Sequence, residues 1–215
     1  MAPLHPKALI LDMDGLMVDS EPLWWSVERS LADTQGLVWT DEMAELCIGT
    51  GLPNTITTMR ELLGLEMGVD EGVAWLVDTF VSRVGALSLK PGCRELLDGA
   101  AGQKLPLALA SSSTRALIDA VLRHFQLADA LAVIVSGDAV AAAKPAPDIF
   151  LRAAELLGEA PADCVVLEDS LAGVAAGQAG GFPVIAVPER EPEAFARLTD
   201  HVVGDLHEAA RLLGL

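Results

Sequence analysis

The stretch ALILDMDGLMVDSEP, residues 8–22, contains a short apolar run followed at once by two aspartates. Ala8–Leu11 is apolar at every position, which is the pattern of a parallel strand buried on both faces. Asp12, Asp14 and Gly15 follow it directly. Ligands in open parallel sheets bind beyond the carboxyl ends of the strands. We therefore expect the two aspartates to lie at the binding edge of such a sheet.

Apolar runs of the same kind recur along the chain, and helical patterns separate most of them. The runs are Leu107–Ala110, Ala132–Val135, Cys164–Leu167 and Val184–Val187, with a weaker one at His201–Val203. Apolar residues at helical spacing indicate helices over Thr114–Phe125 and Asp148–Leu157. Alternating strands and helices are joined by right-handed crossovers. The sequence therefore predicts an α/β fold, a doubly wound parallel sheet forming a Rossmann-like core.

Residues 20–87 break this alternation. They contain no convincing strand, and apolar residues recur at helical spacing, as in Thr55–Leu63. Ser20 is a plausible N-cap for the first helix of the stretch. We interpret residues 20–87 as a helical insertion in a core made of residues 1–19 and 88–215.

Composition and charge limit the classes of partner. Hydrophobic residues make up 52% of the 215-residue chain, which is enough for a sizeable core, and the formal net charge is −17. A surface so acidic repels phosphate backbones and anionic lipid. A small phosphate can still bind where a metal ion and a lysine invert the local field. We therefore expect no nucleic acid and no membrane as partner, and a monomer or small homo-oligomer.

The cysteines and the first residues favour a cytoplasmic location. Cys47, Cys93 and Cys164 are odd in number and widely spaced, which suits a reducing compartment better than a disulfide framework. Met1–Lys7 lacks the apolar region of a signal peptide. No apolar run approaches the roughly 20 residues that a membrane-spanning helix needs.

Polar side chains of a distinct kind follow four of the predicted strands. They are Asp12 and Asp14, then Ser111 to Thr114, then Lys144 beyond a loop, and finally Glu168 with Asp169. Carboxylates crowded into one site either share protons or surround a cation, and hard oxygen ligands favour Mg²⁺. Phosphoryl transfer needs a nucleophile, positive charge on the phosphoryl oxygens and a proton for the leaving group. These residue types meet those needs, and either aspartate could attack while the other acts as general acid.

In this order and at strand ends, the four motifs resemble those of the haloacid dehalogenase-like hydrolase superfamily. The stretch DMDGLMVDSEP, residues 12–22, is similar to the sugar-phosphatase and phosphomutase branch. The resemblance covers essentially the whole chain, and it implies that residues 20–87 form a helical cap. It also implies that Asp12 is the nucleophile that forms an aspartyl-phosphate, and that Asp14 is the general acid and then the base. A proton donor at position 14 argues against dehalogenation, because a departing halide needs no proton.

The same resemblance implies how the remaining motif residues act. Ser111 and Lys144 would bind the transferring group, and backbone N–H groups near Gly15 and Ser112 would surround the phosphoryl oxygens. Mg²⁺ would be held by the residues of two motifs: Asp12, the backbone carbonyl of Asp14, Asp169, and Glu168 either directly or through a neighbouring group.

The substrate is predicted from departures within the insertion. Where the family's β-phosphoglucomutase has a histidine, this chain has Trp24, and its loop Cys47–Pro53 contains no basic residue. Such a loop offers little to hold a second phosphate, which favours a phosphatase acting on a small phosphorylated metabolite such as a sugar or polyol phosphate. Arg60 and Arg83 elsewhere in the insertion leave a phosphomutase as the alternative, and a non-catalytic phosphoacceptor or regulatory module is a third. Trp24 could either stack on a sugar ring or pack within the insertion.

Overall fold

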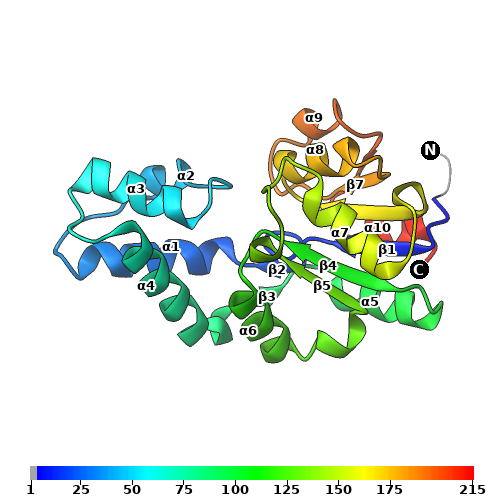
Figure 1. Ribbon diagram of the computed structural model, residues 1–215, viewed down its shortest axis with the longest axis horizontal. Coiled ribbons are helices and arrows are strands. Elements are labelled where there is room, and N and C mark those ends of the chain that lie inside the picture. Colours follow the sequence, from blue (N-terminus) through cyan, green and yellow to red (C-terminus); the bar gives the residue numbers. More distant parts are fainter. Residues whose placement is uncertain (1–3) are drawn as a thin grey trace. The chain divides into compact units, whose positions relative to one another are not determined.

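The computed structural model describes residues 4–215, and the chain divides into two compact units. One unit comprises the residues up to Asp19 together with Ser88–Leu215, and the other is Ser20–Leu87. The first is built on a parallel sheet, whereas the regular elements of the second are all helical (Figure 1).

The first unit contains a six-stranded sheet in the order β5-β4-β1-β6-β7-β8, with every neighbouring pair parallel. The strands are β1 (Ala8–Leu11), β4 (Leu107–Ser111), β5 (Val133–Ser136), β6 (Cys164–Glu168), β7 (Val184–Ala186) and β8 (His201–Val202). The predicted α/β parallel-sheet fold is confirmed, and each strand end lies within one residue of the end of the predicted run. Since β1 lies between β4 and β6, the chain crosses to both sides of β1, and its carboxyl end is the topological switch point.

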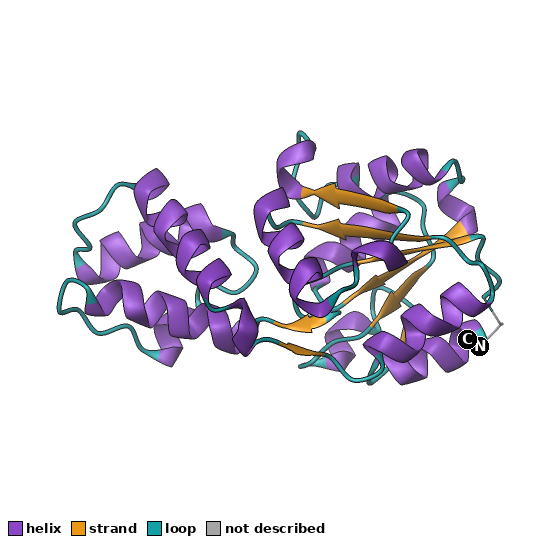
Figure 2. Ribbon diagram, turned by 90° about the horizontal axis from the view of Figure 1, so that it is seen from below, coloured by secondary structure: helices purple, strands orange, loops and turns teal. Residues whose placement is uncertain are grey.

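Helices cover both faces of this sheet (Figures 1 and 2). They are α5 (Cys93–Gly102), α6 (Arg115–Phe125), α7 (Asp148–Leu157), α8 (Leu171–Ala179), α9 (Pro192–Phe195) and α10 (Leu206–Leu213), with 3-10 turns η2 (Ala128–Ala130), η3 (Gly137–Ala139) and η4 (Pro161–Asp163). On one face, Ala8 and Ile10 of β1 belong to a buried cluster with Phe150 of α7 and Val174 of α8. Strand side chains alternate between faces, so Leu9 lies on the other face, where it is fully buried. Burial on both faces explains why the strands appear in the sequence as unbroken apolar runs.

A two-stranded ribbon joins the points where the chain leaves and re-enters the first unit. Its strands, β2 (Val18–Asp19) and β3 (Ser88–Leu89), pair antiparallel, with Val18 opposite Leu89. The backbone N–H of Lys90 also donates to the carbonyl of Met17 at 2.9 Å. The ribbon was not predicted, because two residues are too few to establish a periodicity.

The second unit consists of α1 (Glu21–Asp33), α2 (Asp41–Glu45), α3 (Leu52–Leu63), α4 (Val69–Ser82) and the 3-10 turn η1 (Val84–Ala86). Helix α4 packs on both α1 and α3, and Phe80 is buried there with the Trp24 ring stacked on it at 4.1 Å between centroids.

Two sequence expectations need correction. Ser20 precedes α1 but its side chain makes no capping hydrogen bond, since its backbone is already helical. Helix α3 begins at Leu52 instead of Thr55, because a proline is well tolerated in the first turn of a helix.

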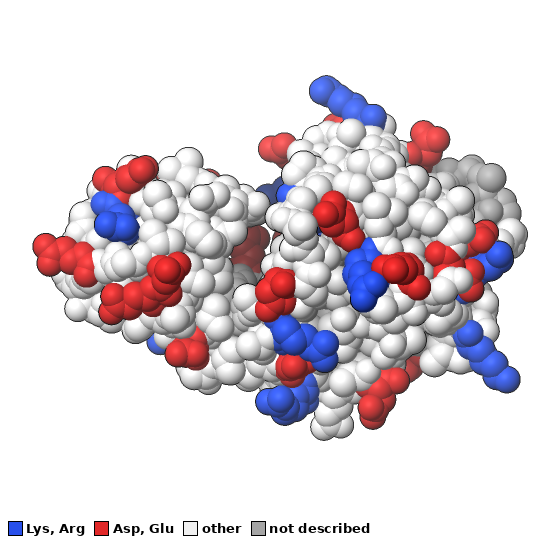
Figure 3. Space-filling model, in the orientation of Figure 1, with Lys and Arg blue, Asp and Glu red and all other residues white. Residues whose placement is uncertain are grey.

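The surface is acidic and the helices are short. Asp and Glu outnumber Lys and Arg by 31 to 14 in the chain. On the face seen in Figure 3, acidic side chains are scattered among fewer basic ones over both units. Among residues 4–215, no helix has the length and apolar character required to cross a bilayer.

One carboxyl group of the second unit is buried although it is not among the predicted site residues. Glu28 of α1 is 5% exposed and accepts a hydrogen bond from Trp39 Nε1 at 2.9 Å. Burial raises the pKa of Glu28 to about 7, although the Trp39 hydrogen bond and the positive charge of Arg29 oppose the rise. Glu28 therefore takes up a proton more readily in the folded unit than in the unfolded chain.

We predict that Glu28→Gln removes a pH dependence from the stability of the second unit. The pKa of Glu28 is higher in the folded state than in the unfolded chain. Its contribution to the free energy of unfolding is therefore fully present below the unfolded value of 4.5 and is lost as pH rises through about 7. The free energy of unfolding of the native protein, relative to the variant, should fall by about 3 kcal/mol between those limits. All four tryptophans lie within residues 20–87, so fluorescence-detected urea unfolding at pH 4 and pH 8 reports on this unit. Parallel pH profiles for the two proteins would contradict the prediction.

Candidate active site

Three neighbouring strands bring their carboxyl ends together at the switch point. Asp12 directly follows β1, and the register pairs Leu11 with Leu109 of β4 on one side and Leu167 of β6 on the other. The backbone N–H of Asp12 donates to the Leu167 carbonyl at 3.1 Å, which continues the ladder by one residue. The backbone at Asp12 is consequently held at this edge of the sheet, and the residue is only 6% exposed.

The ammonium group of Lys144 is the hub of this edge. Lys144 Nζ lies 2.5 Å from Asp12 Oδ1, 2.6 Å from Glu168 Oε1 and 3.2 Å from the Ala110 carbonyl oxygen. An ammonium has three N–H donors, so these acceptors use all of them. The side chain is 7% exposed and lies 4.8 Å from the centre of the Phe150 ring. One lysine thus connects residues at the ends of β4, β1 and β6.

Glu168 is held by hydrogen bonds at both carboxylate oxygens. Oε1 accepts from Lys144, while Oε2 accepts from the backbone N–H and the hydroxyl of Ser170, both at 2.9 Å. Ser170 in turn caps α8 by accepting from the Gly173 N–H at 3.0 Å. A Cβ at Gly173 would lie 1.8 Å from Glu168 Oε1, so only glycine fits. This geometry gives Glu168 the role of holding Lys144, and direct metal binding would compete with those contacts.

Asp14 is oriented by two serine hydroxyls. Its Oδ2 accepts from Ser113 Oγ at 2.8 Å and from Ser111 Oγ at 3.3 Å. Its Oδ1 is buried and has no hydrogen-bond partner among the described residues. The sequence prediction included Ser111 and Ser112 but missed Ser113, although the serine run itself was the available signal. Ser112 is solvent-exposed.

Gly15 and Asp169 lie against each other. Gly15 has a φ of +81°, and a Cβ there would lie 2.0 Å from Asp169 Oδ2, so the position requires glycine on both counts. The N–H of Gly15 already donates to the Val18 carbonyl at 2.9 Å. The prediction concerned backbone N–H groups near Gly15, and a phosphate contact from the Gly15 N–H itself would require that hydrogen bond to break. The predicted substrate residue Trp24 belongs to the other unit, where it packs on Phe80.

The charges at this edge are unbalanced. Burial, the negative charge of Glu168 and that of Asp14 raise the pKa of Asp12 to about 7 against the attraction of Lys144. Burial and the same kind of repulsion raise the pKa of Asp169 well above its ordinary range. Burial alone would lower the pKa of Lys144, but Asp12 and Glu168 more than offset it, so the lysine stays charged. A buried group of carboxylates facing one lysine is a place where a further cation is stabilising.

The oxygen donors at this edge fit Mg²⁺. No three His, Cys, Asp or Glu side chains among the described residues form a ready-made metal cluster. Mg²⁺ does not need one, because it usually takes one or two carboxylates together with water and a phosphate oxygen. Asp12 and Asp169 can supply the carboxylates, and a cation would offset the burial and the repulsion that raise their pKa values. Their role as ligands, with the Asp14 carbonyl, remains a prediction.

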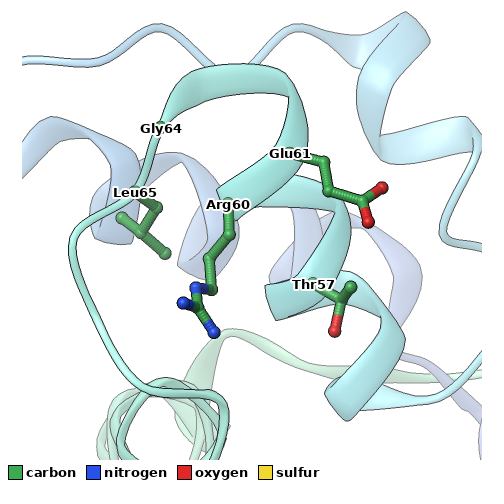
Figure 4. Close-up of a pocket in the computed structure, with 5 residues that line it drawn as sticks. All are labelled: Thr57, Arg60, Glu61, Gly64 and Leu65. Carbon is green, nitrogen blue, oxygen red and sulfur yellow. The ribbon is translucent and has the colours of Figure 1, made fainter.

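A separate pocket lies on the second unit, and its lining includes no residue predicted for catalysis. It has a volume of about 420 Å³ and is lined by Thr57, Arg60, Glu61, Gly64 and Leu65 (Figure 4). Arg60 and Glu61 leave α3 in different directions, so they do not form one charged cluster.

We predict that Lys144→Met destabilises the first unit by about 3–5 kcal/mol in magnesium-free buffer, because it leaves buried carboxylates without their cation. Chemical unfolding followed by far-ultraviolet circular dichroism measures the loss. Glu168→Gln added to Lys144→Met should recover part of it by removing one of those charges. The matched control is Lys90→Met, whose partner Glu189 at 3.3 Å is largely exposed and whose loss should cost under about 1 kcal/mol. Equal losses of stability from Lys144→Met and Lys90→Met would refute the stabilising role of Lys144 among the buried carboxylates.

Comparisons with known proteins find similarity over most of the chain. The profile of a family described as "Haloacid dehalogenase-like hydrolase" matches residues 9–187. Protein CbbY of Rhodobacter capsulatus is 36% identical over 194 residues, covering 85% of this chain and 85% of that protein. Hexitol phosphatase B of Escherichia coli K12 is 33% identical over 206 residues, covering 89% and 87%.

Two further matches concern structure and length. The crystal structure of CbbY from Rhodobacter sphaeroides in complex with phosphate superposes with a TM-score of 0.86 at 26% identity, covering 98% of this chain and 100% of that one. The bifunctional riboflavin kinase/FMN phosphatase of Arabidopsis thaliana is 34% identical over 183 residues. This chain spans only about half of that longer protein, since the match covers 85% of the chain and 48% of the relative.

Proposed function

Because the chain belongs to the haloacid dehalogenase-like hydrolases, we propose that it is a magnesium-dependent phosphatase that acts through an aspartyl-phosphate on Asp12. The observation that carries the proposal is the buried contact of Asp12 with Lys144, next to Asp14 and Asp169, at the switch point of the sheet. The cytoplasm is the proposed location, in keeping with three free, buried cysteines.

In the proposed first step, Asp12 attacks the phosphorus atom of a phosphomonoester. Lys144 holds Asp12 Oδ1, so the carboxylate is fixed and Oδ2 is the attacking oxygen. As the bond from phosphorus to the ester oxygen breaks, Asp14 gives its proton to the departing alkoxide. Ser111, at the end of the neighbouring strand, donates a hydrogen bond to a phosphoryl oxygen. The products of this step are the free alcohol and the aspartyl-phosphate.

In the second step, water attacks the phosphorus atom and Asp14, now a carboxylate, takes the proton of that water. The bond from phosphorus to Asp12 breaks, and inorganic phosphate leaves. When bound by Asp12, Asp169 and the Asp14 carbonyl, Mg²⁺ supplies positive charge to the phosphoryl oxygens. Glu168 acts on both steps through Lys144, whose position it holds.

The proposed substrate is a small sugar or polyol phosphate. Hexitol phosphatase B is among the similar proteins, and CbbY was crystallised with phosphate. A chain with a net charge of −17 is a poor match for polyanions, which favours a small phosphorylated metabolite as the partner. We propose that residues 20–87 serve as the cap that selects it, and that Trp24 contributes through its ring.

We predict that the protein hydrolyses p-nitrophenyl phosphate in the presence of Mg²⁺, and that chelation stops the reaction. Asp12→Asn should abolish phosphate release because the amide is a poor nucleophile. Asp14→Asn should lower turnover by on the order of 10²–10⁴-fold, since the aspartyl-phosphate then lacks a base for its hydrolysis. Asp98→Asn, an exposed position on α5, is the matched control and should have no effect. Activity that survives Asp12→Asn would exclude the mechanism.

We also predict the product formed from a hexose 1-phosphate. A phosphatase releases inorganic phosphate, whereas a mutase returns an isomeric sugar phosphate. The loop Cys47–Pro53 carries no Lys or Arg to hold a second phosphate, so free phosphate should account for the substrate consumed. Phosphorus NMR of the reaction mixture distinguishes the two, and isomerised sugar phosphate without free phosphate would favour the mutase.

A further inference from the structure

Ser113 is the hydroxyl closest to the proposed general acid, and the reaction described above gives it no role. Its Oγ lies 2.8 Å from Asp14 Oδ2, against 3.3 Å for Ser111 Oγ. Ser111 has other partners, because it also accepts from the Ser113 backbone N–H at 3.1 Å and is assigned to the phosphoryl group. When Ser111 turns to substrate, Ser113 is left as the hydroxyl that holds Asp14.

The backbone of Ser113 is fixed on both sides. Its N–H donates to Ser111 Oγ, and its carbonyl accepts from the Gly137 N–H at 3.0 Å. Gly137 also packs tightly on Ser112, since a Cβ at position 137 would lie 2.2 Å from the Ser112 carbonyl oxygen. The loop between β4 and α6 therefore presents the Ser113 hydroxyl from a constrained position.

The two oxygens of the Asp14 carboxyl have different surroundings. Oδ2 accepts from hydroxyl groups, whereas Oδ1 is buried and accepts from no described group. Ser113 therefore fixes one oxygen of the Asp14 carboxyl group and leaves Oδ1 without a hydrogen-bond partner among the described residues.

We propose that Ser113 is a positioning residue for Asp14, which keeps Oδ2 as the acceptor and Oδ1 as the oxygen that gives its proton to the leaving group. The inference rests on the proposed phosphatase activity. In the step concerned, the O–H bond at Oδ1 breaks, a new O–H bond forms on the departing alkoxide, and the electron pair stays on Asp14. Ser113 itself neither gains nor loses a proton.

The test compares two leaving groups, because only a poor one needs the proton. p-Nitrophenolate departs without assistance, whereas the alkoxide of glycerol 1-phosphate does not. The ratio kcat/KM reports the steps up to release of the alcohol, so it isolates acid catalysis from the later hydrolysis. Ser113→Ala should lower kcat/KM for glycerol 1-phosphate by about tenfold or more and leave that for p-nitrophenyl phosphate within about twofold.

Three companion variants sharpen the comparison. Ser113→Thr keeps a hydroxyl and should restore the glycerol 1-phosphate rate. Ser136→Ala is the matched control, because Ser136 also ends a strand and donates to an aspartate, Asp138, outside the proposed machinery. In an Asp14→Asn background, Ser113→Ala should have no further effect on kcat/KM, since the group it positions is already lost.

The outcomes separate this inference from the proposed function. Equal falls in kcat/KM for both phosphates, or a full additional fall in the Asp14→Asn background, would overturn the role of Ser113 while the phosphatase assignment stands. Failure of the native protein to hydrolyse either phosphate would overturn both. If circular dichroism shows that Ser113→Ala does not fold, Ser113→Cys, with its weaker donor, replaces it in the same comparison and must show the same selective loss.

Discussion

The contact of one buried ammonium group with three strand ends is the constraint on which the core depends. Lys144 lies far along the chain from Asp12, yet its three donors reach β4, β1 and β6 together. The group makes a cluster of carboxylates tolerable in the interior, and it sets where Asp12 and Glu168 must lie. The position of Glu168 in turn explains two neighbouring residues. Gly173 leaves room for the Glu168 carboxylate, and Ser170 donates a hydrogen bond to it. The site and the sheet edge are therefore one structure.

Much of this could be predicted because burial leaves a strong signal in sequence. Strands covered on both faces are apolar throughout, so their ends are visible, and the polar residues that follow them fall at the same edge. That reasoning placed Asp12, Ser111 and Lys144 correctly beside the switch point. It could not assign partners, because the pairing of Lys144 with Glu168 or of Ser113 with Asp14 depends on loop geometry. The ribbon of β2 and β3 was missed for a different reason, its brevity.

The helical unit illustrates another limit. Spacing of apolar residues predicted that residues 20–87 are helical, but it could not show that a carboxyl group, Glu28, would be buried among them beside Trp39. A pattern analysis counts glutamate as a surface residue, and only the packed structure shows its partner. Helix α3 begins at Leu52, before the predicted Thr55, because the first turn of a helix accepts a proline such as Pro53.

The β2–β3 ribbon has a consequence for how this architecture can change. Val18 and Leu89 pair antiparallel, so the residues between them form the connection of a hairpin. The pairing does not depend on the length of that connection. The entropy of closing that connection grows only slowly with its length. Whole modules can thus be lengthened, shortened or exchanged at this junction while the strand ends that carry the chemistry keep their register. The sheet unit and residues 20–87 are therefore free to diverge at different rates within a single chain.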